Sequence, residues 1–209
     1  MKITDVKVHI LQSKLEQPFA FSQGWVRVRS ATIVEIHTDA GLIGWGEAFT
    51  QGLESPQIAA STIEYSLKPL VLGENPKNVE VLWHSMYNQT RDFGRKGSVM
   101  AAISGIDIAV WDILGKFYQV PVSQLIGGRF RASVQPYATG FYRVTGENEG
   151  DRLAEEAIAH NDAGFKAMKI KLGFGVNDDI KVMRQIGRAI EGRDVELMVD
   201  TNHAYGRTE

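Results

Sequence analysis

The sequence predicts an α/β protein in two parts: an α+β region with a three-stranded antiparallel meander plus helices, then the first part of a TIM-type (β/α) barrel. Three observations support this prediction. Strand-like segments joined by turns fill the first fifty residues, helical periodicity follows to about residue 118, and strands then alternate with helices. A Gly-Gly pair at 127–128 separates the two patterns, so the predicted domains are residues 1–127 and 128–209.

Composition narrows the possible classes of protein. A chain of 209 residues, 44% of them hydrophobic, can bury the core of one large domain or two small ones. The formal net charge of −2 offers no basic surface to nucleic acid. The sequence has no cysteine, which excludes disulfides and thiolate metal sites and fits a cytoplasmic location. No signal peptide is evident and no stretch approaches the roughly 18 apolar residues of a membrane span, so we expect no membrane partner.

The first region is expected to form its meander from residues 3–12, 30–39 and 40–49. The last two of these strands meet at an Asp-Ala-Gly turn. The long link between the first two strands is rich in aromatic and polar residues, which predicts a mobile loop. Residues 19–25 within that link, and residues 49–55, are therefore candidate lids over a binding site.

Helices are expected next along the chain. Ser-Pro at 55–56 and Asn-Pro at 75–76 each match an N-cap followed by a first-turn proline, and a third helix is indicated by apolar residues at helical spacing across 103–117. Trp83 and Trp111 lie on the apolar faces of the last two helices. Aromatic residues at this spacing mostly fill cores, so we predict that both pack rather than bind a ligand.

The second region alternates strands and helices. Strands are expected to begin near residues 134, 167 and 195, with helices between them that end at Gly164 and near Gly192. This order implies parallel strands, and their spacing of about 30 residues matches a barrel of eight such units in about 250 residues. No Gly-x-Gly-x-x-Gly follows the first strand, which argues against a dinucleotide site.

Two lysines stand on one side of the second barrel strand. Lys169 and Lys171 are two residues apart, so both project to the same face, about 6.6 Å apart along the strand. The apolar residues that alternate with them are expected to face the helices, which turns the lysines into the barrel near the strand end where barrel active sites form. Ammonium groups there need acidic partners or an anionic ligand. A salt-bridged pair without catalytic function is the alternative.

A carboxylate follows at the end of the third barrel strand. Asp200 ends an apolar run, and Asn202 lies two positions later. An aspartate at a strand end often caps the next helix. Beside two lysines it could instead hold a hard cation such as Mg²⁺, which in turn could bind a substrate carboxylate.

At these residues the sequence resembles the enolase superfamily, in its mandelate racemase and muconate lactonizing branch. The segments "GLIGWGEA" and "AAISGIDIAVWDILGK" look like the family's capping domain, and "KIK" followed by "MVDTN" looks like the start of its modified barrel. The resemblance implies that Lys171 is the base that removes a proton α to a carboxylate. It implies that Lys169 polarises that carboxylate and depresses the neighbouring pKa, that Asp200 is the first of three Mg²⁺ ligands, and that Asn202 contacts the substrate.

The resemblance also implies an overall activity. It is Mg²⁺-dependent proton abstraction from a carboxylate, such as an acid sugar or its lactone, through a metal-stabilised enediolate that leads to cycloisomerisation. An acid-sugar dehydratase or a racemase of the same superfamily is an alternative, and a non-catalytic binding module is another. The remaining metal ligands and the opposite-face acid or base would follow Glu209, so we expect a longer protein, a fragment inactive by itself, and a homo-oligomer.

Overall fold

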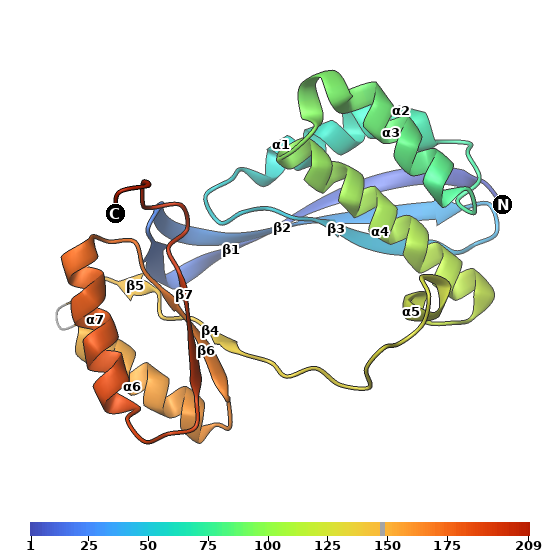
Figure 1. Ribbon diagram of the computed structural model, residues 1–209. Coiled ribbons are helices and arrows are strands. Elements are labelled where there is room, and N and C mark those ends of the chain that lie inside the picture. Colours follow the sequence, from blue (N-terminus) through green and yellow to red (C-terminus); the bar gives the residue numbers. More distant parts are fainter. Residues whose placement is uncertain (147–148) are drawn as a thin grey trace. The chain divides into compact units, whose positions relative to one another are not determined.

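A computed structural model describes residues 1–146 and 149–209 of the chain. The described residues form two compact units: residues 1–14 with 28–130, and residues 15–27 with 131–209 (Figure 1). A long hairpin of β1 (Ile3–Phe21) and β2 (Gly24–Thr38) contributes to both units. The α/β class predicted from the sequence is confirmed, and the domain boundary after residue 127 stays a prediction.

The hairpin corrects one expectation from the sequence. The link between the first two predicted strands is not a loop, because β1 and β2 continue through it and turn only at Ser22 and Gln23. The tip of β1 also pairs antiparallel with β5 (Arg143–Val144), where Phe19 lies opposite Val144. Residues 10–14 are exposed, so neither face of the strand requires apolar side chains there. A strand without alternating apolar and polar residues cannot be distinguished from a loop by its sequence.

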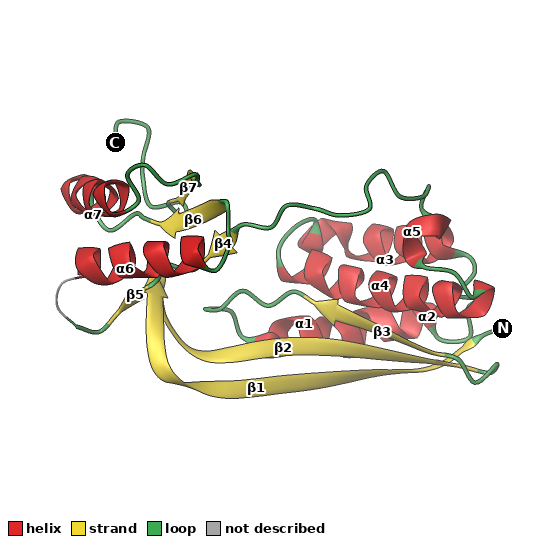
Figure 2. Ribbon diagram, turned by 90° about the horizontal axis from the view of Figure 1, so that it is seen from below, coloured by secondary structure: helices red, strands yellow, loops and turns green. Residues whose placement is uncertain are grey.

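The first unit packs helices on an antiparallel sheet. Its strands run in the order β3-β2-β1, with β3 at Ile43–Ala48, and the helices lie together on one face of the sheet (Figure 2). The helical elements are α1 (Pro56–Thr62), the π-helical turn η1 (Ile63–Leu67), α2 (Lys68–Val71), α3 (Val79–Gly94), α4 (Ser98–Tyr118) and α5 (Val122–Leu125). Ser55 is the N-cap of α1 as predicted. The predicted start of the next long helix is wrong, because Asn75 forms a local turn to the Lys77 N–H and α3 begins after Asn78.

Glycines let α4 lie directly on β3. A Cβ added at Gly46 would lie 2.1 Å from the carbonyl oxygen of Gly105, and one at Gly44 would lie 2.1 Å from that of Ala109. Only glycine allows such close approach of two backbones. The last two glycines of "GLIGWG", Gly44 and Gly46, therefore serve helix–sheet packing.

The central helix α4 also corrects the prediction that no segment resembles a membrane span. By length and composition alone it is apolar enough to cross a membrane. In the structure one side of α4 belongs to the buried core of the first unit, whereas Ile108, Phe117 and Tyr118 are exposed. Apolar residues on both sides of the helix give it a composition that matches that of a spanning helix.

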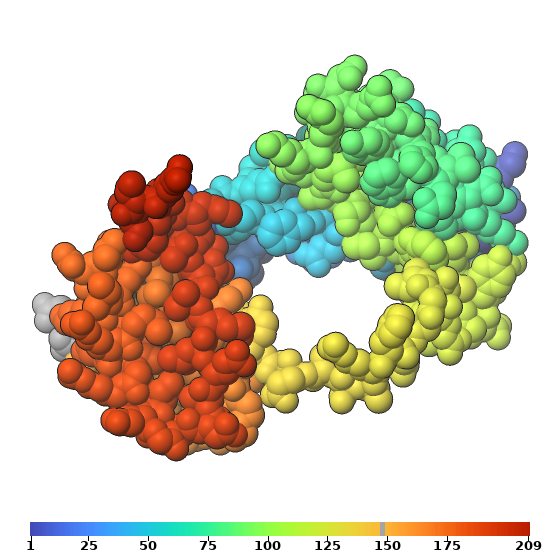
Figure 3. All heavy atoms as spheres, in the orientation of Figure 1, coloured from blue at the N-terminus to red at the C-terminus, as the bar shows by residue number. Residues whose placement is uncertain are grey.

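An exposed linker, residues 126–137, leads into the second unit. Figure 3 shows it as a single thickness of chain, and Phe130 within it is 99% exposed. The first barrel strand, predicted to begin near residue 134, is shorter than expected: β4 comprises only Ala138–Thr139. Pro136 cannot donate a ladder hydrogen bond, and the pairing with the next strand begins at Ala138.

The second unit contains the predicted βαβαβ order. Its parallel sheet runs β4-β6-β7, with β6 at Ala167–Lys171 and β7 at Glu196–Asp200. The helices α6 (Glu149–Asp162) and α7 (Val176–Ala189) lie on one side of this sheet (Figure 1). Part of the predicted first helix, residues 147–148, lies outside the described residues. The buried core here includes side chains from β6 and both helices, among them Leu153, Met168, Ile170, Val182 and Ile186.

Candidate active site

The second unit brings the two lysines to one carboxylate. Lys171 Nζ donates to Asp200 Oδ2 at 2.7 Å, and Lys169 Nζ lies 3.4 Å from the same oxygen. Met168 and Ile170 point to the other side of β6, where both are fully buried. The alternation predicted for this strand is therefore correct, because the strand period of two separates a charged face from a core face.

Strand pairing explains how Asp200 reaches the lysines. β6 and β7 are parallel, and Lys171 and Asp200 are direct partners in their register. Both residues end their strands, so their side chains lie at the carboxyl edge of the sheet, which is the edge that carries active sites in barrels.

Asn202, two residues after Asp200, also contacts Lys171. Its side-chain oxygen accepts a hydrogen bond from Lys171 Nζ at 2.9 Å, and its backbone N–H donates to Asp200 Oδ1 at 3.1 Å. Asn202 has a φ of 48°, a left-handed conformation that asparagine adopts more readily than most residues. The structure thus places all four predicted site residues together.

The charges of this group are unbalanced. The pKa of Asp200 lies below its ordinary value because Lys171 donates to the carboxylate; burial opposes this shift, and the Asn202 N–H and Lys169 add to it. Burial lowers the pKa of Lys169, but Tyr137 and Asp200 together raise it more, so the net shift is upward. Two ammonium groups therefore face one carboxylate, which leaves a positive site suited to an anion.

Two tyrosines near the lysines were not singled out from the sequence. The ring centroid of Tyr137 is 5.5 Å from Lys169 Nζ, and that of Tyr142 is 5.8 Å from Lys171 Nζ. The Tyr142 ring also packs on Phe19 of the hairpin, with centroids 4.4 Å apart. The sequence offered one signal for Tyr142, which follows β4 at the strand end where a barrel places its site residues, whereas Tyr137 precedes that strand.

The tip of the hairpin touches the loop after β7. Ser22 Oγ donates to the Thr201 carbonyl at 2.7 Å, and Gln23 Nε2 donates to the Asn202 carbonyl at 2.6 Å. Side chains of the candidate lid at residues 19–25 therefore donate hydrogen bonds to the backbone of the loop that carries Asn202. The second candidate, residues 49–55, belongs to the first unit.

The atoms of this group that could bind a metal ion are oxygens. Asp200 offers a carboxylate and Asn202 an amide oxygen, the kinds of ligand that Mg²⁺ prefers. Nowhere in residues 1–146 and 149–209 do three or more histidine, aspartate or glutamate side chains gather as a metal site. The residues present thus fit Mg²⁺ in kind and supply one of the carboxylates that such a site needs.

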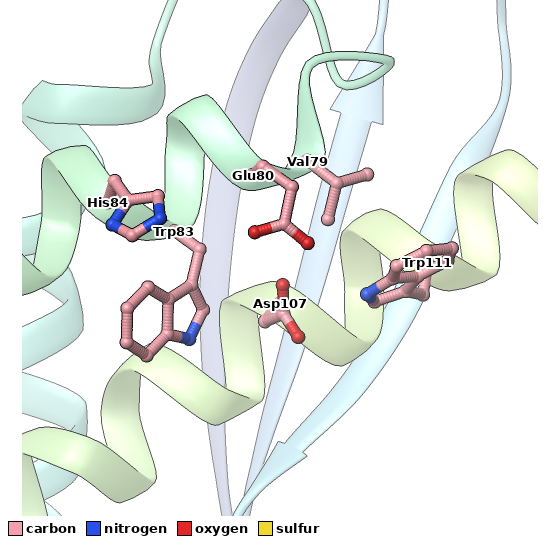
Figure 4. Close-up of a pocket in the computed structure, with 6 residues that line it drawn as sticks. All are labelled: Val79, Glu80, Trp83, His84, Asp107 and Trp111. Carbon is pink, nitrogen blue, oxygen red and sulfur yellow. The ribbon is translucent and has the colours of Figure 1, made fainter. Parts of the chain in front are cut away.

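A separate hollow of about 370 Å³ lies in the first unit between α3 and α4 (Figure 4). Trp83 and Trp111 line it and pack against the core, so the packing role predicted for both is confirmed. Burial raises the pKa of Asp107 in this hollow, and the charge of Glu80 raises it further. The lysine–aspartate group lies in the other unit, so we place the candidate active site there.

Comparison with known proteins identifies the family of the chain. Residues 3–127 match the mandelate racemase/muconate lactonizing enzyme N-terminal domain, and residues 152–209 match the enolase C-terminal domain-like family. The chain is 39% identical over 209 residues to D-galactarolactone cycloisomerase of Agrobacterium fabrum, covering 100% of this chain and 54% of that protein. It is 39% identical over 173 residues to arabinonate dehydratase of Saccharolobus solfataricus, covering 82% of this chain and 45% of that protein.

A solved structure gives the same result. The 3,6-anhydro-D-galactonate cycloisomerase from Zobellia galactanivorans superimposes with a TM-score of 0.84 at 37% identity, covering 100% of this chain and 53% of that one. The chain thus spans about half the length of these relatives. With a family match over residues 3–127, the chain belongs to the mandelate racemase/muconate lactonizing enzyme branch of the enolase superfamily.

Proposed function

We propose that this protein removes the α-proton of a carboxylate substrate, an acid sugar or its lactone, and that the resulting enediolate proceeds to a cycloisomerised product. Lys171 is the base, Lys169 binds and polarises the substrate carboxylate, and Asn202 contacts the substrate. The observation that carries the proposal is the shared contact of both lysines with Asp200 at the carboxyl edge of the sheet.

The contacts of Lys171 suit a base. A neutral amine has two N–H bonds and one lone pair. If Asp200 Oδ2 and Asn202 Oδ1 accept the two N–H bonds, at 2.7 and 2.9 Å, the lone pair is left in the one remaining tetrahedral direction. Two fixed acceptors thereby aim the amine, which is the positioning that proton abstraction requires.

Asp200 is the residue of this chain that we propose as a Mg²⁺ ligand. A bound Mg²⁺ would supply positive charge to the substrate carboxylate as the α-proton leaves. Lys169 adds a second positive charge on the same side of the sheet, 3.4 Å from Asp200. Asp200→Asn should therefore weaken Mg²⁺ binding measured by calorimetry.

A second candidate activity is dehydration of an acid sugar. It is favoured by the 39% identity to arabinonate dehydratase of Saccharolobus solfataricus. Both activities begin with the same proton abstraction and differ in the bond that breaks next. A panel of acid sugars and their lactones separates them, because loss of water, ring opening or closing, and inversion at the α-carbon give different products. A cytoplasmic location and a homo-oligomeric state stay predictions.

The proposal is tested in the whole protein by exchange of the substrate α-hydrogen with deuterium from solvent. Lys171→Ala should lower the exchange rate by about 10²- to 10⁴-fold, the usual contribution of a general base, while Mg²⁺ binding persists. Lys166→Ala is the matched control, since Lys166 pairs with the exposed Asp194 at the other end of β6. Normal exchange in folded Lys171→Ala would refute the proposed base.

A further inference from the structure

A buried aspartate joins the two loops that follow the site strands. Asp179 lies in the first turn of α7 and is only 6% exposed. Its carboxylate accepts hydrogen bonds from the backbone N–H groups of Gly173, at 2.6 Å, and Phe174, at 3.3 Å. It also accepts one from the hydroxyl of Tyr205. Gly173 follows β6, and Tyr205 follows β7, so one carboxylate bridges the two loops.

The two loops touch closely at Gly173. A Cβ added there would lie 2.5 Å from Ala204 Cβ, 2.7 Å from the Thr201 carbonyl oxygen and 2.8 Å from Ser22 Cβ. Gly173 has a φ of 99°, a conformation that strongly favours glycine. The loop after β6 thus packs against the loop after β7 without room for a side chain.

This junction lies next to the base and its partner in sequence. Gly173 is two residues beyond Lys171, and Thr201 stands between Asp200 and Asn202. A shift of the second loop would therefore alter the 2.9 Å contact between Lys171 Nζ and Asn202 Oδ1. We propose that Asp179 and Tyr205 are positioning residues, which hold the loop that carries Asn202 against the strand end that carries Lys171.

The effect of these two residues on catalysis rests on the proposed function, whereas their effect on the position of the Asn202 loop does not. Burial raises the pKa of the Tyr205 hydroxyl and Asp179 adds to the shift, so the hydroxyl remains a donor across the neutral range. The competing explanation is that Asp179 only caps the start of α7, as first-turn and N-cap acids often do. Tyr205→Phe distinguishes the two, because it removes the bond between the loops and leaves the Gly173 and Phe174 bonds in place.

The first measurement needs no catalytic activity. Trace acetylation of the chain, resolved for each lysine by mass spectrometry, reports how readily the Lys171 amine is reached. The Lys171 side chain is 10% exposed in the parent, so release of Asn202 should raise its labelling rate. We expect an increase of about 3-fold or more in Tyr205→Phe, since a displacement of about 1 Å is enough to change reactivity strongly.

The control is Asp162→Asn. Asp162 also joins two segments of this unit, through a 2.5 Å ion pair with Arg193, but at the opposite ends of the strands. It should leave Lys171 labelling unchanged, with at most a small loss of melting temperature. If Lys171 labelling is also unchanged in Tyr205→Phe, the positioning role is refuted and Asp179 is only a cap.

The second measurement uses the whole protein. If the parent exchanges the α-hydrogen, Tyr205→Phe should lower kcat by about 10-fold because the base is misplaced, and should raise KM by a smaller factor because Asn202 moves while Lys169 still binds the carboxylate. Unchanged kcat would overturn the catalytic part of the inference. If the parent shows no exchange, the proposed function fails by itself, and the labelling result still decides the positioning role.

Discussion

Replacing Asp200 by asparagine should show how strongly the lysine pair depends on one negative charge. Asp200 Oδ2 lies 2.7 Å from Lys171 Nζ and 3.4 Å from Lys169 Nζ. Asparagine has nearly the same shape, and its oxygen can still accept the Asn202 N–H that Asp200 Oδ1 accepts. The substitution therefore removes charge with little change in packing, and leaves two ammonium groups facing each other without compensation.

The exposure of the three side chains sets the expected size of the effect. Asp200 is 27% exposed, Lys169 25% and Lys171 10%. Exposed ion pairs contribute about 0 to 1 kcal/mol, whereas breaking a buried pair costs about 3 to 5 kcal/mol. This partly buried group lies between those limits, so we expect Asp200→Asn to lower the free energy of unfolding at pH 7 by about 1 to 3 kcal/mol.

The effect should depend on pH in one direction. The pKa of Asp200 is lowered in the folded protein from its ordinary value of 3.8, so the folded state binds its proton less readily than the unfolded state. The stabilisation is then fully present above the unfolded pKa and is lost as the pH falls through the lowered folded pKa. The difference in stability between parent and variant should be constant from pH 7 to about pH 5 and shrink in more acidic solution.

Urea unfolding of both proteins at a series of pH values measures this difference. Asp194→Asn is the matched control, because Asp194 forms an ion pair with Lys166 in the same unit but is 94% exposed. It should change the free energy of unfolding by less than about 0.5 kcal/mol. If Asp200→Asn is as stable as the parent at pH 7, or if its deficit persists unchanged in acid, Asp200 does not compensate the lysine pair.

Two further predictions follow from contacts described above. Tyr137→Phe removes a group that raises the pKa of Lys169, so the pH midpoint of Lys169 acetylation should move downward. The midpoint of the remote Lys166 should not change. An unchanged Lys169 midpoint would show that Tyr137 does not act on Lys169. Gly46→Ala places a methyl group 2.1 Å from the Gly105 carbonyl oxygen and should cost about 3 kcal/mol of unfolding free energy, the upper end of the usual cost of overpacking. Gly187→Ala, at a helical position with no neighbour within 4 Å, should instead stabilise by about 0.5 to 1 kcal/mol, and equal urea midpoints for these two variants would contradict the packing of α4 on β3.

Local sequence patterns were sufficient to predict the position of a residue wherever that position depends on its neighbours in sequence. The alternation of Lys169 and Lys171 with apolar residues predicted a charged face and a core face, and both are present. Parallel strands of a βαβαβ run end at the same edge, so the position of Asp200 at a strand end was enough to predict that it meets the lysines.

Other features depend on residues far apart in the chain. The long strand β1 is exposed at residues 10–14, and its partner at the hairpin tip is β5, more than a hundred residues later. The approach of Tyr137 to Lys169, and the bond of Tyr205 to Asp179, leave no periodic trace in the sequence. The start of α3 was missed because an asparagine can form a local turn as readily as a helix cap.

By itself, the sequence determined the α/β class, the order of strands and helices in the second unit, and the four residues that meet at its carboxyl edge. These follow from periodicity and strand direction, which are properties of short segments. The tertiary structure decided which hydrogen-bond acceptors hold Lys171, which tyrosines stand beside the lysines, and how Asp179 joins the loops behind them. Those contacts arise only when distant segments pack, because a hydrogen bond between side chains requires positions correct to a few tenths of an ångström.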